Sequence, residues 1–371
     1  MTNAESVVLD PARMRRVLVM RLDNVGDVVL LTPALRALRA ALPVASITLL
    51  ASPAGAQLAP LLPWVDDVRA VRALWQDTSG SLPFDPAREQ SFVDDLARER
   101  YDAALIATSF SQSPHAAAYA CYLAGVPVRA ALAPDFAGGV LSCPVAPPSE
   151  GTHQVDRALA LLAGLGVPPA GTHLELRVPS ATTQAVRRTL HAEGVDGPYA
   201  VVAPGASCPT RRYDPGRFAQ VGAGLTCEVH LPVVVVGSAR EQALADGIAD
   251  AADRSGCGIP AVSLAGRTGV PELAAVVAGA ALVVTNNSGP LHVAEAFHRP
   301  TVALFAGTER ESEFAPRHAP LRLLRRATTC APCRAFTCPF AHECLDIPPD
   351  EVVTAALGVL SASRLPVPMT G

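Results

Sequence analysis

Short apolar runs alternate with amphipathic segments along nearly the whole chain, and this alternation restricts the folds open to it. The runs have the length of strands buried on both faces, whereas the segments between them have helical spacing. Strands that alternate with helices form parallel sheets covered by helices. The sequence therefore predicts an α/β protein, with strands at 17–20, 47–51, 103–107, 200–203, 233–236, 261–264, 282–285 and 301–305.

The chain is long enough for two domains. It has 371 residues, and a single hydrophobic core seldom grows beyond roughly 250 to 300 residues. A stretch rich in proline and glycine, 167–180, separates two segments with helical spacing, 156–163 and 181–193. We predict an N-terminal domain at 1–178 and a C-terminal domain at 179–371, with a ligand cleft between them. The remaining segments are predicted as loops at 79–86 and 134–150 and a helix at 350–360.

The composition excludes several classes of protein. A net charge of −4 gives no general attraction to nucleic acid. No apolar run approaches the roughly 20 residues needed to span a bilayer. The N-terminal residues Arg13, Arg15 and Arg16 precede only a short apolar stretch, so we expect neither a signal peptide nor a membrane span. We therefore expect a cytoplasmic protein whose cysteines are reduced.

A carboxylate, Asp27, lies where the first predicted strand turns into the first predicted helix. Ligands of open parallel sheets bind just beyond such strand ends. The turn contains a single glycine, Gly26, so it has neither a dinucleotide fingerprint nor a P-loop. It offers a charge for chemistry or, on the simpler interpretation, only a favourable interaction with the helix dipole.

A second polar strand end follows the predicted strand 282–285. Asn286, Asn287 and Ser288 can cap the next helix, and Gly289 allows a ligand to approach the backbone. The N-terminus of such a helix attracts phosphate, and His292 follows one turn later. Capping and packing alone would also account for these residues.

Three further strand ends carry groups suited to a nucleotide. Arginine pairs match phosphate oxygens, glycine turns expose N–H donors, and a carboxylate can accept from ribose hydroxyls. Each feature is common by itself, but five polar strand ends on one pattern favour a ligand site. These groups are Gly205, Ser207, Arg211 and Arg212 after 200–203, Glu241 after 233–236, and Gly307 with Thr308 after 301–305.

Four of the nine cysteines lie close together near the C-terminus, at Cys330, Cys333, Cys338 and Cys344. The first two have the C-x2-C spacing of a zinc knuckle, and four thiolates can hold Zn²⁺ tetrahedrally. The second two are spaced more loosely. A structural zinc site is therefore one hypothesis, and reduced thiols or adventitious disulfides are the other.

The strand-end motifs resemble glycosyltransferase family 9, the bacterial ADP-heptose:lipopolysaccharide heptosyltransferases and their relatives. The resemblance extends from Val17 to about Val353. It implies a GT-B fold, in which two Rossmann-like domains with parallel sheets face an interdomain cleft, the first for the acceptor and the second for a nucleotide sugar. The motifs are Gly26-Asp27-Val28, Thr32-Pro33-Ala34-Leu35, Asn287-Ser288-Gly289-Pro290-Leu291-His292-Val293-Ala294, Cys330-Ala331-Pro332-Cys333, Cys338-Pro339 and Cys344-Leu345.

The resemblance also implies roles for particular residues. Asp27 is similar to the catalytic base of the family, and Arg21 to the basic residue beside it. The donor residues that it implies are Ser207 and Arg211 for the diphosphate, Glu241 for the ribose, and Ser288, Gly289 and His292 for the donor loop. The chain departs from the family in having Asn287 where an acid is usual, and Arg21-Leu22-Asp23-Asn24-Val25 before Gly26. Asn287 can still bind a sugar hydroxyl, and Asp23 is either a polar contact or a solvated turn residue.

These features predict an inverting glycosyltransferase that moves a sugar, heptose being one candidate, from a nucleotide-sugar donor to a lipopolysaccharide-type or other cell-envelope acceptor. One base is sufficient for this reaction. No D-x-D sequence occurs, so a carboxylate-held Mg²⁺ is not expected, and neither is any other required cofactor. Peripheral contact with the inner face of the cytoplasmic membrane is compatible with such an acceptor. The alternatives are a catalytically silent sugar-nucleotide-binding protein of the same fold and an interaction protein built around the cysteines.

Overall fold

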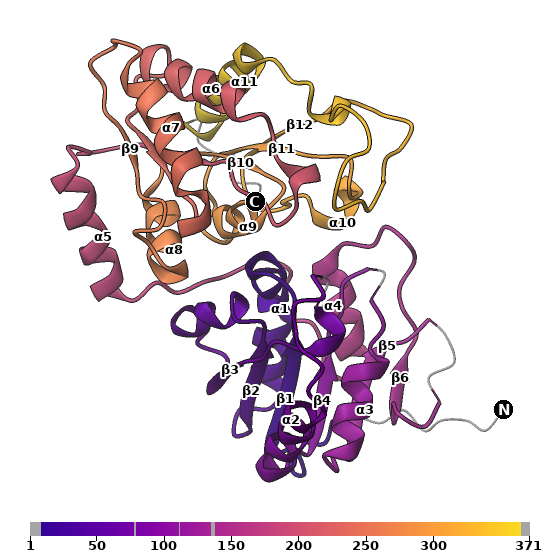
Figure 1. The fold of residues 1–371 in the computed structure, drawn as a ribbon. Coiled ribbons are helices and arrows are strands. Elements are labelled where there is room, and N and C mark those ends of the chain that lie inside the picture. Colours follow the sequence, from indigo (N-terminus) through magenta and orange to yellow (C-terminus); the bar gives the residue numbers. More distant parts are fainter. Residues whose placement is uncertain (1–8, 78, 111, 135–137, 365–371) are drawn as a thin grey trace, which may run out of the picture. The chain divides into compact units, whose positions relative to one another are not determined.

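The computed structural model describes residues 9–77, 79–110, 112–134 and 138–364. The chain divides into two compact units, Met1–Glu175 and Leu176–Gly371. This division falls close to the boundary predicted after residue 178. Each unit contains a parallel sheet with helices packed against it (Figure 1).

The sheet of the first unit has six parallel strands in the order β3-β2-β1-β4-β5-β6. The central strand β1 is fully apolar on both faces from Val17 to Met20, which explains why it pairs on both sides. Val17 is in register with Ile47 of β2 and with Ala103 of β4. The strands are β1 (Arg16–Arg21), β2 (Ser46–Ala51), β3 (Asp67–Ala70), β4 (Ala103–Ile106), β5 (Val128–Leu132) and β6 (Cys143–Val145).

The helices of the first unit include one, α1, whose first turn carries Asp27. Helix α1 begins after Asn24, and Asp27 in its first turn accepts a hydrogen bond from the backbone N–H of Asn24. Its apolar side chains, such as Leu35 and Leu38, are almost fully buried, and each contributes about 1.5–3 kcal/mol to folding. The helices are α1 (Val25–Ala41), α2 (Pro86–Glu99), α3 (His115–Leu123) and α4 (Gln154–Ala163), with short 3-10 helices η1 (Gly55–Leu61) and η2 (Leu74–Gln76).

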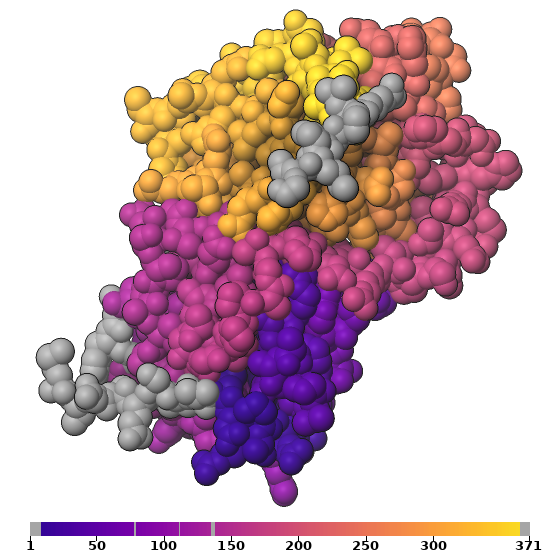
Figure 2. All heavy atoms as spheres, turned by 180° about the vertical axis from the view of Figure 1, so that it is seen from behind, coloured from indigo at the N-terminus to yellow at the C-terminus, as the bar shows by residue number. Residues whose placement is uncertain are grey.

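The sheet of the second unit also has six parallel strands. Counted from the edge strand β9, their order is β9-β8-β7-β10-β11-β12, which repeats the strand order of the first sheet. Its strands are β7 (Ala200–Ala203), β8 (Val233–Val235), β9 (Ala261–Ser263), β10 (Leu282–Asn286), β11 (Thr301–Leu304) and β12 (Leu321–Leu324). Its helices are α5 (Ser180–Ala192), α6 (Pro215–Cys227), α7 (Gln242–Asp253), α8 (Val270–Gly279), α9 (Gly289–Ala296), α10 (Glu311–Phe314) and α11 (Pro349–Arg364), and its 3-10 helices are η3 (Pro209–Arg211), η4 (Ala239–Glu241) and η5 (Glu343–Leu345). Helix α11 packs against α6, and Figure 2 shows part of α11, in yellow, on the surface of this unit.

Both sheets reverse their strand order once. In the first unit the reversal lies between β1 and β4, and in the second it lies between β7 and β10. Loops on the two sides of a reversal leave the sheet in opposite directions, so the carboxyl ends of those two strands border an open crevice where ligands bind. The topology therefore marks one candidate site in each unit.

All eight predicted strands are present, but four short strands were missed. Edge strands β3 and β12 contain mainly partly exposed residues, so they lack the apolar signal of a buried strand. In β5 the apolar run is interrupted by Arg129, whose buried guanidinium is satisfied by backbone carbonyls such as those of Val126 and Val140. Strand β6 lies inside 134–150, so the prediction of a continuous loop there was wrong; residues 135–137 lie outside the described ones.

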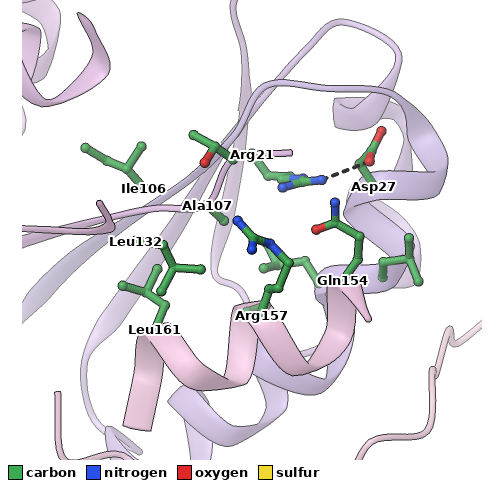
Figure 3. Close-up of a pocket in the computed structure, with 12 residues that line it drawn as sticks. Arg21, Asp27, Ile106, Ala107, Leu132, Gln154, Arg157 and Leu161 are labelled. Carbon is green, nitrogen blue, oxygen red and sulfur yellow. Dashed lines mark hydrogen bonds and ion pairs between the residues drawn. The ribbon is translucent and has the colours of Figure 1, made fainter. Parts of the chain in front are cut away.

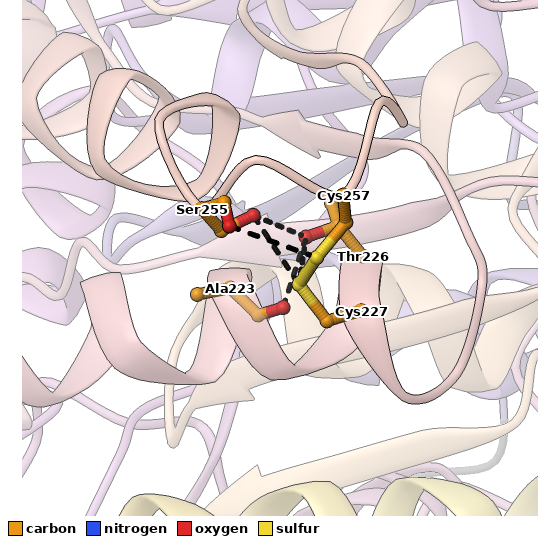
Figure 4. The surroundings of a disulfide bond; sticks show 5 residues. All are labelled: Ala223, Thr226, Cys227, Ser255 and Cys257. Carbon is orange, nitrogen blue, oxygen red and sulfur yellow. Dashed lines mark hydrogen bonds between the residues drawn. A yellow bond between two sulfur atoms is a disulfide. The ribbon is translucent and has the colours of Figure 1, made fainter.

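The prediction that all cysteines are reduced was also wrong. Cys227, the last residue of α6, forms a disulfide with Cys257, which follows α7 (Figure 4). Helices α6 and α7 pack together, and this packing brings the two Cα atoms to 5.4 Å. Ser255 lies beside the bond, with its hydroxyl 3.3 Å from the Cys227 sulfur. In the described part of the chain, no helix is both long and apolar enough to cross a bilayer.

Candidate functional site

The first candidate site lies at the β1–β4 reversal and is centred on Asp27. Arg21, the last residue of β1, donates from Nη2 to Asp27 Oδ1 at 2.8 Å. The second carboxylate oxygen accepts the Asn24 N–H at 3.1 Å. The predicted neighbours Arg21 and Asp27 are therefore in direct contact, and the carboxylate is held from two directions while its side chain stays 15% exposed.

Residues after β4 and before α1 complete this cluster. The Arg21 guanidinium also donates to the Ser109 hydroxyl at 2.8 Å, and this hydroxyl lies 3.3 Å from Asp27 Oδ1. Asp23 forms an ion pair with Arg21 at 3.1 Å and accepts from the Gln112 amide at 2.6 Å. Asp23 is thus a buried polar contact, and the alternative of a solvated turn residue was wrong. Ser109 and Gln112 were missed, although the rule that polar residues follow strand ends applied to them as well.

The charges in the cluster are buried and depend on one another. Burial disfavours the charged form of Arg21, but the carboxylates of Asp23 and Asp27 outweigh it and raise the pKa of the guanidinium. Burial raises the pKa of Asp23, while Arg21 acts in the opposite direction. One permanent cation therefore lies between two carboxylates and contacts both of them.

A small pocket opens beside Asp27, and helix α4 supplies two of its polar groups (Figure 3). Arg157 and Gln154 extend from α4 toward the pocket that Arg21 and Asp27 also line. Gln154 is only 4% exposed, and its amide nitrogen has no hydrogen-bond partner among the described residues. Its amide can therefore donate to a bound oxygen next to Asp27. The sequence analysis missed both residues, because they lie inside a helix instead of at a strand end.

The second candidate site lies at the β7–β10 reversal. Asn286, the last residue of β10, is fully buried and links the two strand ends. Its amide donates to the carbonyl of Pro204 at 2.7 Å, and its oxygen accepts the N–H of Tyr213 at 3.1 Å. Asn286 therefore fixes the loop after β7 and does not cap α9. Ser288 occupies the N-cap position of α9, but its side chain makes no capping hydrogen bond, so the predicted side-chain cap was wrong.

A buried cluster around Arg211 follows these strand ends. Arg211 Nε donates to the Thr308 hydroxyl at 3.2 Å, and Arg211 Nη2 forms an ion pair with Glu309. Glu309 also accepts from the Asn287 amide at 2.9 Å and from the Thr308 hydroxyl. Asn287, Thr308 and Glu309 are all at most 5% exposed. Glu309 was missed because a carboxylate repels a diphosphate, so nothing in the sequence indicated one at the predicted diphosphate site.

Glu241 lies against the glycine turn after β7. Its Oε2 accepts from the N–H and the hydroxyl of Ser238, each at 2.8 Å. A Cβ on Gly205 would lie 2.1 Å from Glu241 Oε1, so only glycine leaves room for this carboxylate. The close approach places Glu241 beside the β7 strand end.

The other predicted donor residues are distributed around the same strand ends. Ser207 is exposed, Gly289 is partly exposed at the start of α9, and His292 is buried near Phe314. Arg211 and Arg212, expected to clamp a diphosphate together, have different partners: Arg211 contacts Thr308 and Glu309, whereas Arg212 donates Nε and Nη2 to the carbonyl of Ala206.

The cysteine segment packs against the Gly307–Thr308 turn. The N–H groups of Cys333 and Arg334 donate to the carbonyls of Gly307 and Thr308 at 3.0 and 3.1 Å. Burial raises the pKa of the Cys344 thiol, and the three other thiols of the segment act in the same direction. Among the residues that the structure describes, no group of three or more metal-ligating side chains is arranged to hold a metal ion.

Two doubly wound parallel sheets, each with a polar cluster at its reversal point, define a protein of two Rossmann-like domains. Residues 90–343, more than half of the chain, match the model of glycosyltransferase family 9 (heptosyltransferase). The chain therefore belongs to glycosyltransferase family 9.

Individual relatives agree with this family assignment. Lipopolysaccharide heptosyltransferase 3 of Escherichia coli K12 is 32% identical over 163 residues, which are 44% of this chain and 46% of that protein. The chain thus spans about half of the length of this relative. The structure of the E. coli ADP-heptose lipopolysaccharide heptosyltransferase II is similar over 94% of this chain and all of that one, with a TM-score of 0.73 and 22% identity. A family 9 glycosyltransferase from Veillonella parvula has a TM-score of 0.75 and 19% identity over 97% of this chain and all of that one. These structures establish the GT-B fold.

Proposed function

We propose that this protein is an inverting glycosyltransferase that moves a heptose from an ADP-heptose-like donor to a lipopolysaccharide-type acceptor without a catalytic metal. The observation that carries the proposal is the geometry of Asp27, a partly exposed carboxylate held by Arg21 and by the start of α1 beside a pocket. The donor and acceptor classes are those in the names of the E. coli relatives. An acceptor of this kind also favours peripheral contact with the cytoplasmic face of the inner membrane.

Asp27 is the base in this mechanism. The acceptor hydroxyl attacks the anomeric carbon, and Asp27 takes its proton as the new C–O bond forms. The bond from the anomeric carbon to the diphosphate breaks on the opposite face, and the nucleoside diphosphate leaves with the bonding electrons. A single displacement inverts the configuration. The Gln154 amide is positioned to orient an acceptor oxygen near Asp27.

The second unit provides the groups that bind the donor. Arg211 retains its charge while the diphosphate departs. The start of α9 at Gly289 directs backbone N–H groups toward an anion. Glu241 is suited to accept from ribose hydroxyls through Oε1, and Gly205 provides the space for it. These groups can stabilise the leaving nucleotide, so the mechanism requires no metal ion.

The experiment that tests the proposal combines binding and turnover. Purified protein is screened by thermal shift with ADP, GDP, UDP and dTDP, because a ligand that binds only the native state stabilises it. It is then assayed for transfer from ADP-heptose to heptose-deficient lipopolysaccharide, with and without EDTA. We expect a shift with ADP and transfer that survives EDTA. Binding without transfer would instead favour a silent nucleotide-sugar-binding protein, and no shift with any nucleotide would refute both functions.

Replacing Gly205 by alanine is expected to weaken ADP binding about tenfold and also to lower the unfolding midpoint. The new Cβ forces Glu241 away from its position, at the cost of two hydrogen bonds worth roughly 1 kcal/mol each. Isothermal titration with ADP measures the effect. Gly247→Ala is the matched control, because a Cβ there meets no atom within 4 Å. Unchanged ADP affinity in Gly205→Ala would show that the nucleotide does not use Glu241.

A further inference from the structure

A buried carboxylate with no role in the reaction described above, Glu309, connects two residues of the donor site. One oxygen pairs with Arg211, and the other accepts from the Asn287 amide and the Thr308 hydroxyl. We propose that Glu309 is a positioning residue that fixes the guanidinium of Arg211 for the donor diphosphate, and that position 287 carries an amide because Glu309 requires a donor there. This inference rests on the proposed function of the second unit.

The hydrogen bonds of Arg211 indicate which part of its guanidinium is used for support. Nε donates to Thr308 and Nη2 to Glu309, so both contacts lie along one edge of the planar group. Nη1 makes no hydrogen bond to any residue that the structure describes. The side chain of Arg211 is 27% exposed, whereas that of Glu309 is 6% exposed. One edge is thus held by buried groups, and Nη1 remains to donate to phosphate oxygens.

The same geometry explains the amide at position 287. An ionised carboxylate only accepts hydrogen bonds, so its neighbour must donate. The Asn287 amide does so at 2.9 Å and is 3% exposed. An aspartate in its place would put two carboxylates in contact in a buried site, where both cannot remain ionised without strong repulsion. Asn287 and Glu309 are therefore a matched donor and acceptor.

Exchanging the two groups tests this match. Asn287→Asp alone is expected to weaken ADP binding at least about tenfold, because contacting residues couple by roughly 0.5–3 kcal/mol. Glu309→Gln alone is also expected to weaken it about tenfold, since the Asn287 amide then faces a second amide and the cluster loses its anion. The double variant Asn287→Asp/Glu309→Gln restores one donor, one acceptor and the original net charge. We expect it to bind ADP within about threefold of the parent.

The readouts are the ADP dissociation constant from isothermal titration and the thermal unfolding midpoint of each protein. Glu351→Gln is the control, because Glu351 also pairs with an arginine, Arg326, through both oxygens but on the surface. Single variants that match the parent, or a double variant no better than the worse single one, would overturn the inference. If the parent binds no ADP, the proposed function fails, whereas recovery of the unfolding midpoint in the double variant still tests the pairing.

Discussion

Asp27→Asn is expected to slow heptose transfer by at least about a hundredfold, the usual scale for loss of a general base. Asparagine has the same shape and can still accept the Asn24 N–H through its oxygen, but it cannot take a proton from the acceptor. Asp23 remains paired with Arg21 at 3.1 Å, so the buried guanidinium keeps an anionic partner. The fold and nucleotide binding should therefore persist.

The measurement is the initial rate of transfer at saturating donor, together with the ADP dissociation constant and the unfolding midpoint. Asp85→Asn is the control, because Asp85 also accepts a backbone N–H at the start of a helix, α2, through its side chain. We expect it to transfer at the rate of the parent. An Asp27→Asn protein with near-normal turnover would exclude Asp27 as the base.

The parts of the fold that could be predicted are those that depend on burial. Strands such as β1 and β10 are apolar on both faces, so their sequence differs clearly from that of the helices around them. Strand ends were therefore easy to locate, and with them Arg21, Asp27 and Asn287. Edge strand β3 lacks this apolar pattern, because its residues are partly exposed to solvent and can therefore be polar.

The missed residues of the candidate sites depend on contacts between segments distant in the sequence. Gln154 reaches the Asp27 pocket only because α4 packs against α1. The disulfide between Cys227 and Cys257 likewise depends on the packing of α6 on α7. Glu309 was missed for a chemical reason, since its charge has the same sign as the expected ligand. The sequence indicates which groups follow a strand, but tertiary packing decides which groups meet.

The two units use the same topology to hold differently arranged ion pairs. At the β1–β4 reversal one cation, Arg21, lies between two carboxylates, so the cluster leaves an acidic group, Asp27, partly exposed. At the β7–β10 reversal one buried carboxylate, Glu309, holds a cation, Arg211, which is the more exposed partner. The proposed base and the proposed anion-binding group thus belong to ion pairs arranged in opposite ways.

Arg211→Met is expected to weaken ADP binding by about ten- to a hundredfold, because a hydrogen bond to a charged group contributes roughly 1.5–3 kcal/mol. It should also lower stability by about 3–5 kcal/mol, since Glu309 is then buried without its cation. The stability loss would obscure the binding loss if only this variant were measured. The double variant Arg211→Met/Glu309→Gln removes both charges and should recover most of the stability but none of the affinity.

Titration with ADP and thermal unfolding of the parent, the single variant and the double variant separate these two effects. Arg212→Ala provides the comparison within the same loop, because Arg212 is exposed and, among the residues that the structure describes, donates only to the carbonyl of Ala206. Its loss should reduce ADP affinity by no more than about threefold, as expected for one neutral-acceptor contact. A larger loss of ADP affinity in Arg212→Ala than in Arg211→Met would identify Arg212, instead of Arg211, as the diphosphate contact. Recovery of affinity together with stability in the double variant would mean that the charge of Arg211 serves only to neutralise Glu309.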